Sequence, residues 1–273
     1  MSANLKEQVK SFIEKTGYPF ELEVASFLHE KGWIVFSSVE YFIPPNYHKR
    51  EIDIIAYKII NNRRIELRIS CKKSVDKPWI LFTTKNRYIK SGYMLKFTPS
   101  SLNYPKYAMI PNILKDLYFF KYNKWTINYS VFSEKRQNEN RSVITDAFMS
   151  SVTSTYQWLY PQMITDNRGT IYFYIALFKG NLFESYYNSS LKTHNLSEIQ
   201  YGQYETIFKL ENYDNIHYSN DILKLKDIAF DRFKIEVIRW EFLDNYLNNI
   251  EKVFSNLSEE DINNFGVGWN ENI

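Results

Sequence analysis

The chain has 273 residues, 44% of them hydrophobic and 24% charged, a balance typical of globular proteins that excludes a disordered chain. Its 34 Lys and Arg nearly balance its 31 Asp and Glu, and its single cysteine excludes an intramolecular disulfide and a cysteine-based zinc cluster. No apolar run approaches the roughly 18 residues of a membrane span, and the amphipathic start lacks the apolar stretch of a signal peptide. We therefore expect a cytoplasmic protein without a membrane partner.

Two helices are predicted at the start of the chain. Residues 5–15 have helical periodicity, with a stripe that we expect to be buried, made of Leu5, Val9, Phe12 and Ile13. Gly17 and Pro19 end this helix. A second helix is predicted over residues 20–31, because Pro19 suits its first turn and Gly32 suits its C-terminal cap.

A strand over residues 33–41 leads into a predicted β-hairpin over residues 51–74. In its second half, Ile65, Leu67, Ile69 and Cys71 alternate with Glu66, Arg68, Ser70 and Lys72, the period of a half-buried strand. Asn61 and Asn62 tolerate the left-handed conformations of a tight turn. Counting back from this turn places Asp53 opposite Ser70 or Cys71, with Lys72 nearby if Asp53 lies on the polar face.

The remaining elements are predicted more coarsely. Strands are expected over residues 79–83, 93–97, 171–178 and 233–240, and helices over residues 142–160 and 242–257. Residues 171–178 are too uniformly apolar for an edge strand. Residues 1–100 would form the first part of the core, 101–141 an insertion of uncertain structure, and 142–273 the rest of the core with a C-terminal extension, all within one domain.

Positive charge is concentrated around the hairpin. Residues 1–100 contain 17 basic and 10 acidic residues, and eleven basic residues between 58 and 96 face only Glu66 and Asp76. Such a stretch attracts a polyanion through phosphate contacts, or is simply a solvated face. The candidate nucleic-acid contacts are Lys49, Arg50, Lys73, Lys77, Lys85 and Arg87.

The hairpin resembles that of the PD-(D/E)xK nuclease superfamily, which places an Asp on one strand and Glu-x-Lys on the next. Here the match is Asp53, followed by Ser70-Cys71-Lys72, so Ser70 stands where the family usually has Glu or Gln. Glu21 lies at the position of the family's helix acid, and Glu23 on the same predicted helix is the alternative. The resemblance covers about the first third of the chain.

The resemblance implies a restriction-endonuclease-like α/β fold, with a mixed central sheet flanked by helices in αβββαβ order and a C-terminal strand and helix as an extension. It implies catalytic roles for Glu21, Asp53, Ser70 and Lys72. Mg²⁺ or Mn²⁺ would be held by Asp53, Glu21 and the backbone carbonyl of Cys71, with Lys72 stabilising the attacking hydroxide or the transition state.

The function implied is an endonuclease that hydrolyses nucleic acid, with DNA favoured, in defence against foreign DNA. A second copy of the chain or a partner subunit fits the same role. The alternatives are an inactive relative that binds nucleic acid or a partner enzyme, and a scaffold without a nucleic-acid ligand. Asp53 could then be an ion-pair partner of Arg68 or Lys72, and Cys71 is expected to be a core thiol in every case.

Overall fold

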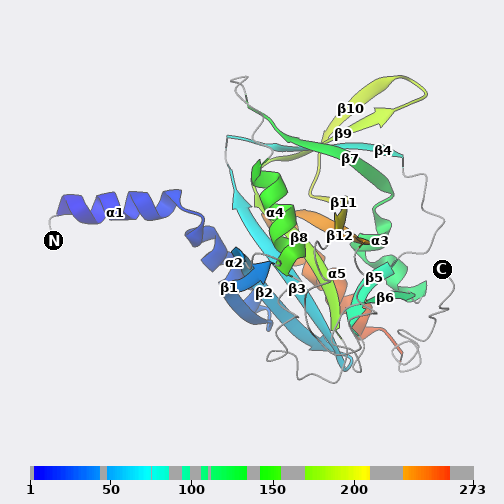
Figure 1. Ribbon diagram of the computed structural model, residues 1–273, viewed down its shortest axis with the longest axis horizontal. Coiled ribbons are helices and arrows are strands. Elements are labelled where there is room, and N and C mark those ends of the chain that lie inside the picture. Colours follow the sequence, from blue (N-terminus) through cyan, green and yellow to red (C-terminus); the bar gives the residue numbers. More distant parts are fainter. Residues whose placement is uncertain are drawn as a thin grey trace.

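The computed structural model describes residues 3–43, 48–74, 76–85, 94–98, 106–109, 112–133, 142–154, 170–209 and 230–258. It is an α/β protein, as the sequence predicted, and its strands form two mixed sheets rather than the single central sheet that was expected (Figure 1). None of the described helices is long and apolar enough to cross a membrane.

The larger sheet has eight strands in the order β1-β2-β3-β8-β12-β11, with β5 also beside β8 and β6 beside β5. β1, β2 and β3 form an antiparallel meander, whereas β8 runs parallel to both β3 and β12. The interior position predicted for residues 171–178 is therefore confirmed. The strands are β1 (Ile34–Ile43), β2 (His48–Ile60), β3 (Arg63–Lys73), β5 (Met94–Thr98), β6 (Lys106–Met109), β8 (Thr170–Lys179), β11 (Tyr201–Lys209) and β12 (Phe230–Arg239).

The predicted hairpin turn is confirmed. Asn61 and Asn62 join β2 to β3 and have φ angles of 46° and 57°, the left-handed region that asparagine adopts more readily than most residues. The Asn61 side-chain amide also donates to the carbonyls of Phe254 and Ser255 at 2.8 and 2.9 Å, at the end of α5 (Leu243–Ser255). These two hydrogen bonds fix the turn against the C-terminal helix.

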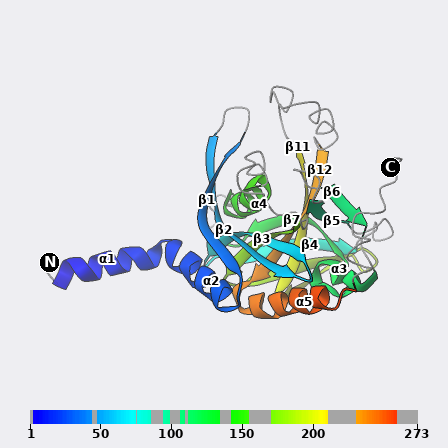
Figure 2. The ribbon, with the colours of Figure 1, turned by 90° about the horizontal axis from the view of Figure 1, so that it is seen from below.

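The two faces of the larger sheet belong to two hydrophobic cores, because alternate residues of β8 point in opposite directions. On one face α2 (Tyr18–Glu30) lies beside α5, with η1 (Asn112–Asp116), α3 (Tyr118–Lys121) and η6 (Trp240–Phe242) completing the cover (Figure 2). On the other face lies α4 (Ser142–Thr153). Residues 112–121, part of the predicted insertion, therefore contribute to the main core.

The smaller sheet has four strands in the order β10-β9-β4-β7. They are β4 (Trp79–Lys85), β7 (Lys124–Val131), β9 (Leu182–Asn188) and β10 (Thr193–Glu198). The parallel pair β3–β8 ends at Lys73 and Lys179 and continues, after a short corner, as the parallel pair β4–β9. A β-carbon on Gly180 at this corner would overlap the carbonyl oxygen of Ser74, so only glycine fits there.

The predicted burial of the first helix is wrong. α1 (Ala3–Lys15) projects from the body of the molecule (Figure 1), and its apolar stripe is open, with Phe12 69% exposed. The helix itself forms because its residues have good helical propensity and an amphipathic pattern. Periodicity identifies the apolar face of a helix, but it does not say whether that face is covered.

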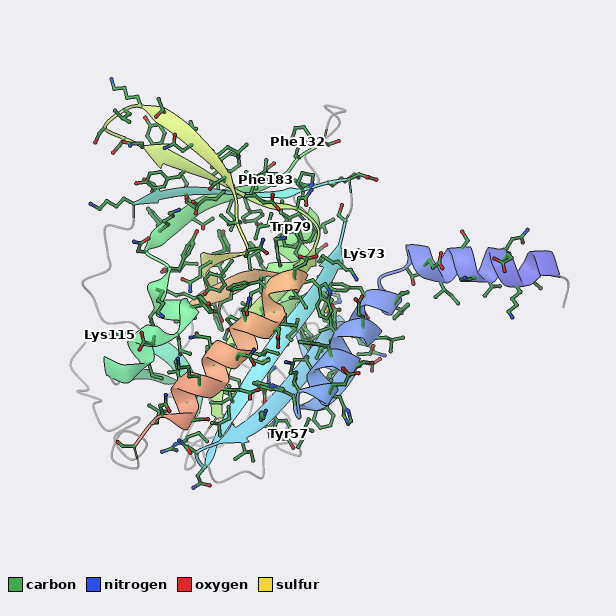
Figure 3. The ribbon with its side chains drawn as sticks, turned by 180° about the vertical axis from the view of Figure 1, so that it is seen from behind. Tyr57, Lys73, Trp79, Lys115, Phe132 and Phe183 are labelled. Atoms are coloured by element: carbon green, nitrogen blue, oxygen red, sulfur yellow. The ribbon has the colours of Figure 1, made fainter. Side chains whose placement is uncertain are left out.

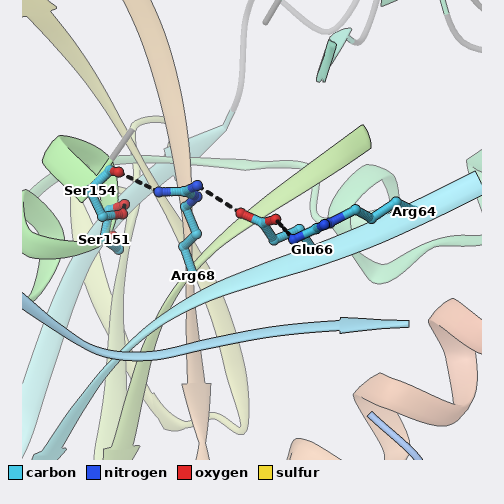
Figure 4. Close-up of polar contacts among 5 residues, drawn as sticks. All are labelled: Arg64, Glu66, Arg68, Ser151 and Ser154. Atoms are coloured by element: carbon cyan, nitrogen blue, oxygen red, sulfur yellow. Dashed lines mark hydrogen bonds and ion pairs between the residues drawn. The ribbon is translucent and has the colours of Figure 1, made fainter. Parts of the chain in front are cut away.

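The polar side of β3 is also unlike the prediction, because it is buried rather than solvated. Glu66, Arg68 and Ser70 are all almost inaccessible. Glu66 binds Arg64 and Arg68 at 2.8 and 2.7 Å, and Arg68 donates to the carbonyl of Ser154 at the end of α4 (Figure 4). The helix predicted over residues 142–160 covers this side, and its part beyond Ser154 lies outside the described residues.

Candidate functional site at a strand fork

The candidate site lies where β2 separates from β3. The β2–β3 ladder ends at the pair Ile54–Ile69, although β3 continues to Lys73 beside β8. Beyond this point, among the strands that the structure describes, β2 pairs only with β1, for example through Ile52 and Val39. The result is a fork in the sheet, and Asp53 is the first residue of β2 on the open side.

The Asp53 carboxylate takes the place of the missing strand partner. Its Oδ2 accepts a hydrogen bond from the backbone N–H of Cys71 at 2.5 Å and from Ser70 Oγ at 3.1 Å. Lys72 Nζ lies 3.9 Å from the same oxygen. Asp53 therefore meets Ser70, Cys71 and Lys72, the neighbours that the hairpin count predicted, and the alternative ion pair with Arg68 does not form because Arg68 binds Glu66.

The backbone carbonyl of Cys71 faces the same fork. In a strand, the N–H and C=O of one residue point to the same side, so a residue whose N–H is aimed at Asp53 also directs its carbonyl there. The Cys71 side chain instead enters the core, where burial and the nearby carboxylates of Asp53 and Glu21 raise the thiol pKa well above its usual value. As predicted, Cys71 is a core thiol, and it is not an activated nucleophile.

Glu21 approaches the fork from α2. Its carboxylate lies over Gly17 at the start of that helix, and its pKa responds to the charges of Asp53, Lys72 and Glu51. Glu23, the alternative helix acid, is instead ion-paired with Lys179 at 2.5 Å. The structure thus brings Glu21, rather than Glu23, to Asp53 and Lys72.

Both acids at the fork are held partly away from water. Burial raises the pKa of Asp53 from its usual value, while Lys72 and the hydrogen bonds from Cys71 and Ser70 oppose that rise. Burial is also the main cause of the raised pKa of Glu21, and repulsion from Asp53 raises that pKa further. Two carboxylates that repel one another and carry a solvation penalty would be relieved by a cation placed between them.

The donor chemistry fits a hard divalent ion. Mg²⁺ is usually bound by one or two carboxylates with waters completing the octahedron, and the fork offers Asp53, Glu21 and the Cys71 carbonyl. Within the described ranges there is no group of three or more His, Cys, Asp or Glu side chains placed to hold a metal ion. Any ion here would depend on the main-chain oxygen and on water.

The basic residues are more dispersed than the sequence suggested. Lys58 is paired with Glu251 at 2.9 Å, and Arg64 and Arg68 both form ion pairs with Glu66. Of the candidate nucleic-acid contacts, Lys49 pairs with Glu40 at 2.5 Å and Arg87 lies outside the described residues. The others are exposed on β2, at the end of β3 and around β4, namely Arg50, Lys73, Lys77 and Lys85.

Two neighbours of the site were missed. Glu51 lies two residues before Asp53 on β2, and this period-2 spacing was a signal in the sequence that it shares a side with Asp53. Lys179 stands at the end of β8 beside Lys73, and no local pattern could have revealed it, because the pairing joins segments about 100 residues apart. Scans of the chain against protein-family models, curated proteins and solved structures found no match.

Proposed function

We propose that the protein is a metal-dependent endonuclease of the PD-(D/E)xK type. The observation that supports this most is the convergence of Asp53, Glu21 and Lys72 at the fork, from β2, α2 and β3. The elements α2, β1, β2, β3, α4 and β8, with β8 parallel to β3, follow the αβββαβ order that the resemblance implies, with β4 to β7, η1 and α3 inserted between β3 and α4.

Each residue has a separate task in this proposal. Asp53, Glu21 and the Cys71 carbonyl would hold Mg²⁺ or Mn²⁺, which when bound would polarise a phosphoryl oxygen and lower the pKa of a bound water. Ser70 Oγ and the Cys71 N–H hold one oxygen of Asp53 in place. Lys72, whose side chain is 30% exposed, can bring positive charge to a phosphate entering from solvent.

The test is cleavage of duplex plasmid and of single-stranded DNA and RNA with Mg²⁺, Mn²⁺ or EDTA. Asp53→Ala and Lys72→Ala should each lower the cleavage rate at least 100-fold, because each removes charge stabilisation of the transition state. The matched control is Lys121→Ala, an exposed lysine of α3 that is paired with Asp116 rather than Asp53. Wild-type rates in the Asp53→Ala and Lys72→Ala proteins would refute the assignment.

A second function is favoured by Ser70. Its side chain is fully buried and donates to Asp53, at the position where the family usually supplies an anionic or amide ligand. A neutral hydroxyl attracts Mg²⁺ far less than a carboxylate does. The second candidate is therefore an inactive relative that retains the fork and binds nucleic acid or a partner subunit without cutting.

Ser70→Glu separates the two candidates. In an enzyme with a weak metal site, the added carboxylate should increase Mn²⁺ affinity in calorimetry and shift cleavage to lower metal concentration. Ser70→Gln is the control, because it has nearly the same size without the charge. If Ser70→Glu folds, binds Mn²⁺ tightly and still fails to cut any substrate, the binding function replaces the nuclease.

A further inference from the structure

The smaller sheet has one covered side and one open side. Trp79 lies on the covered side and stacks on Phe178 of β8, with ring centroids 4.2 Å apart. Residues that alternate with this side face outward, and six of them carry rings. We call these the outer aromatic face: Phe82, Trp125, Phe132, Phe183, Tyr187 and His194. In Figure 3, Phe132 lies above this sheet and Trp79 below it.

The strand registers bring these rings onto one surface. Tyr187 is opposite His194, and their ring centroids are 5.0 Å apart. Phe82 has Ser185 beside it on β9 and Asn128 beside it on β7, so small polar side chains separate the rings. Trp125 and Phe132 are 41% and 49% exposed. Leu196, opposite Ser185, lies on the same side and is 67% exposed, so the surface offers ring faces and edges with an aliphatic side chain among them.

The charges around this surface favour an anionic ligand. Exposed lysines stand at the ends of its strands, namely Lys77, Lys85 and Lys192. The two carboxylates of β9 and β10 are turned away or neutralised, since Glu184 is buried against Lys124 and Glu198 is ion-paired with Arg239. Among the described residues near this side, Asp76 is the one exposed acid without such a partner.

The outer aromatic face is continuous with the candidate site along the chain and the sheet. β3 and β8 leave the fork together and become β4 and β9 of the smaller sheet. Lys77 follows Lys72 by five residues. The backbone at the corner is held by a hydrogen bond from Ser74 N–H to the Lys179 carbonyl and another from Trp79 N–H to the Asn181 carbonyl, each 3.0 Å long.

We propose that the outer aromatic face is a stacking platform for single-stranded nucleic acid, with unpaired bases on the rings and phosphates along the lysines. The proposal rests on the nuclease function and names its substrate class. Aromatic rings bind unpaired bases through stacking with little regard to sequence, whereas paired bases in a duplex are already stacked and do not present their faces.

The test is the binding of a fluorescein-labelled thymidine 20-mer and a 20-base-pair duplex, measured by anisotropy in EDTA so that cleavage cannot interfere. Phe183→Ala and Trp125→Ala should each weaken binding of the single strand about 10-fold and change duplex binding less than 2-fold. Trp125→Phe should retain most of the affinity. The control is Phe12→Ala, which removes a ring from α1 that is more exposed than either test ring. Melting temperatures identify any variant that is unfolded.

The outcomes separate the platform from the nuclease. Unchanged single-strand binding in Phe183→Ala and Trp125→Ala would overturn the platform, and cleavage that depends on Asp53 would still support the nuclease. Ring-dependent binding without cleavage in any metal would sustain the platform and end the nuclease proposal. Finally, a dimer in gel filtration that Phe183→Ala dissociates would assign this face to a second copy of the chain and overturn the platform.

Discussion

Two groups of charges lie on the same strand, β3, and behave differently. In the middle of the strand, Arg64, Glu66 and Arg68 form a buried network with contacts of 2.7 and 2.8 Å, closed by the end of α4. At the end of the strand, Lys72 lies 3.9 Å from Asp53 and both side chains reach solvent. The charges of the first group are paired with one another, whereas the second has two acids with raised pKa values and one loosely placed cation.

This difference identifies which charges are available for chemistry. A buried ion pair that is covered by a helix and closed to solvent is not accessible to a ligand. Carboxylates that are half-solvated, mutually repulsive and incompletely paired can gain by binding a cation. The basic stretch of the sequence contained both kinds, and only the three-dimensional arrangement distinguishes them.

The largest expected effect is on the buried network. Glu66→Ala leaves Arg64 and Arg68 close together without their shared carboxylate and should lower the free energy of unfolding by about 3–5 kcal/mol. Urea denaturation measures this loss. The control is Glu40→Ala, which removes an exposed ion pair with Lys49 and should change stability by less than about 1 kcal/mol. Equal losses in the two variants would remove the distinction between buried and open charges.

Glu236 is a second buried carboxylate, and it can be compared with Glu66 because its hydrogen-bond donors are tyrosines instead of arginines. Glu236 on β12 accepts hydrogen bonds from Tyr201 at 2.6 Å and Tyr246 at 2.5 Å, and burial raises its pKa from 4.5 to about 7, while Lys234 lowers it. The folded state therefore holds a proton that the unfolded state releases above pH 4.5. This stabilisation is complete below that pH and declines until about pH 7, a change on the order of 3 kcal/mol.

The measurement is urea denaturation between pH 4.5 and 8. Glu236→Gln should remove the decline, because the amide does not titrate and can still accept a tyrosine hydrogen bond. Parallel curves for the two proteins would show that Glu236 is ionised in the folded state throughout this range.

The smallest effect on stability is expected at the fork. Asp53→Asn keeps an oxygen for the Cys71 N–H and Ser70 Oγ and removes a charge that burial disfavours, so the free energy of unfolding should stay within about 1 kcal/mol of wild type. The thermal shift caused by Mn²⁺ should disappear at the same time. Asp76→Asn, an exposed acid near the fork, serves as the control and should keep the metal-dependent shift. A large loss of stability in Asp53→Asn would make Asp53 a structural residue.

Local patterns predicted the hairpin and its turn well. The alternation along β3 and the two asparagines were sufficient because both depend on neighbours in sequence. The covering of each surface was less predictable. The stripe of α1 was expected to be buried and is exposed, while the polar side of β3 was expected to face solvent and lies under α4. Coverage depends on distant segments, which a single periodicity does not report.

In the candidate site, too, local contacts were predictable from the sequence and contacts between distant segments were not. The meeting of Asp53 with Ser70, Cys71 and Lys72 could be counted from the turn, since the hairpin register is local. The choice between Glu21 and Glu23 could not be made from the sequence, because it depends on how α2 is rotated against the sheet and on Lys179 of β8. The smaller sheet was foreseen only in β4, since β7, β9 and β10 were not predicted and pair with it across long separations.

The central place of β8 has a consequence for how the molecule is made. β8 supports β3 along its whole length, yet it is contributed by Thr170–Lys179, about 100 residues later in the chain. During synthesis, the segment that contains Glu21, Asp53 and Lys72 emerges well before the strand that holds it in place. Closing so long a loop is entropically costly and slow. A growing polypeptide therefore carries the site residues for some time without the architecture that would make them act together.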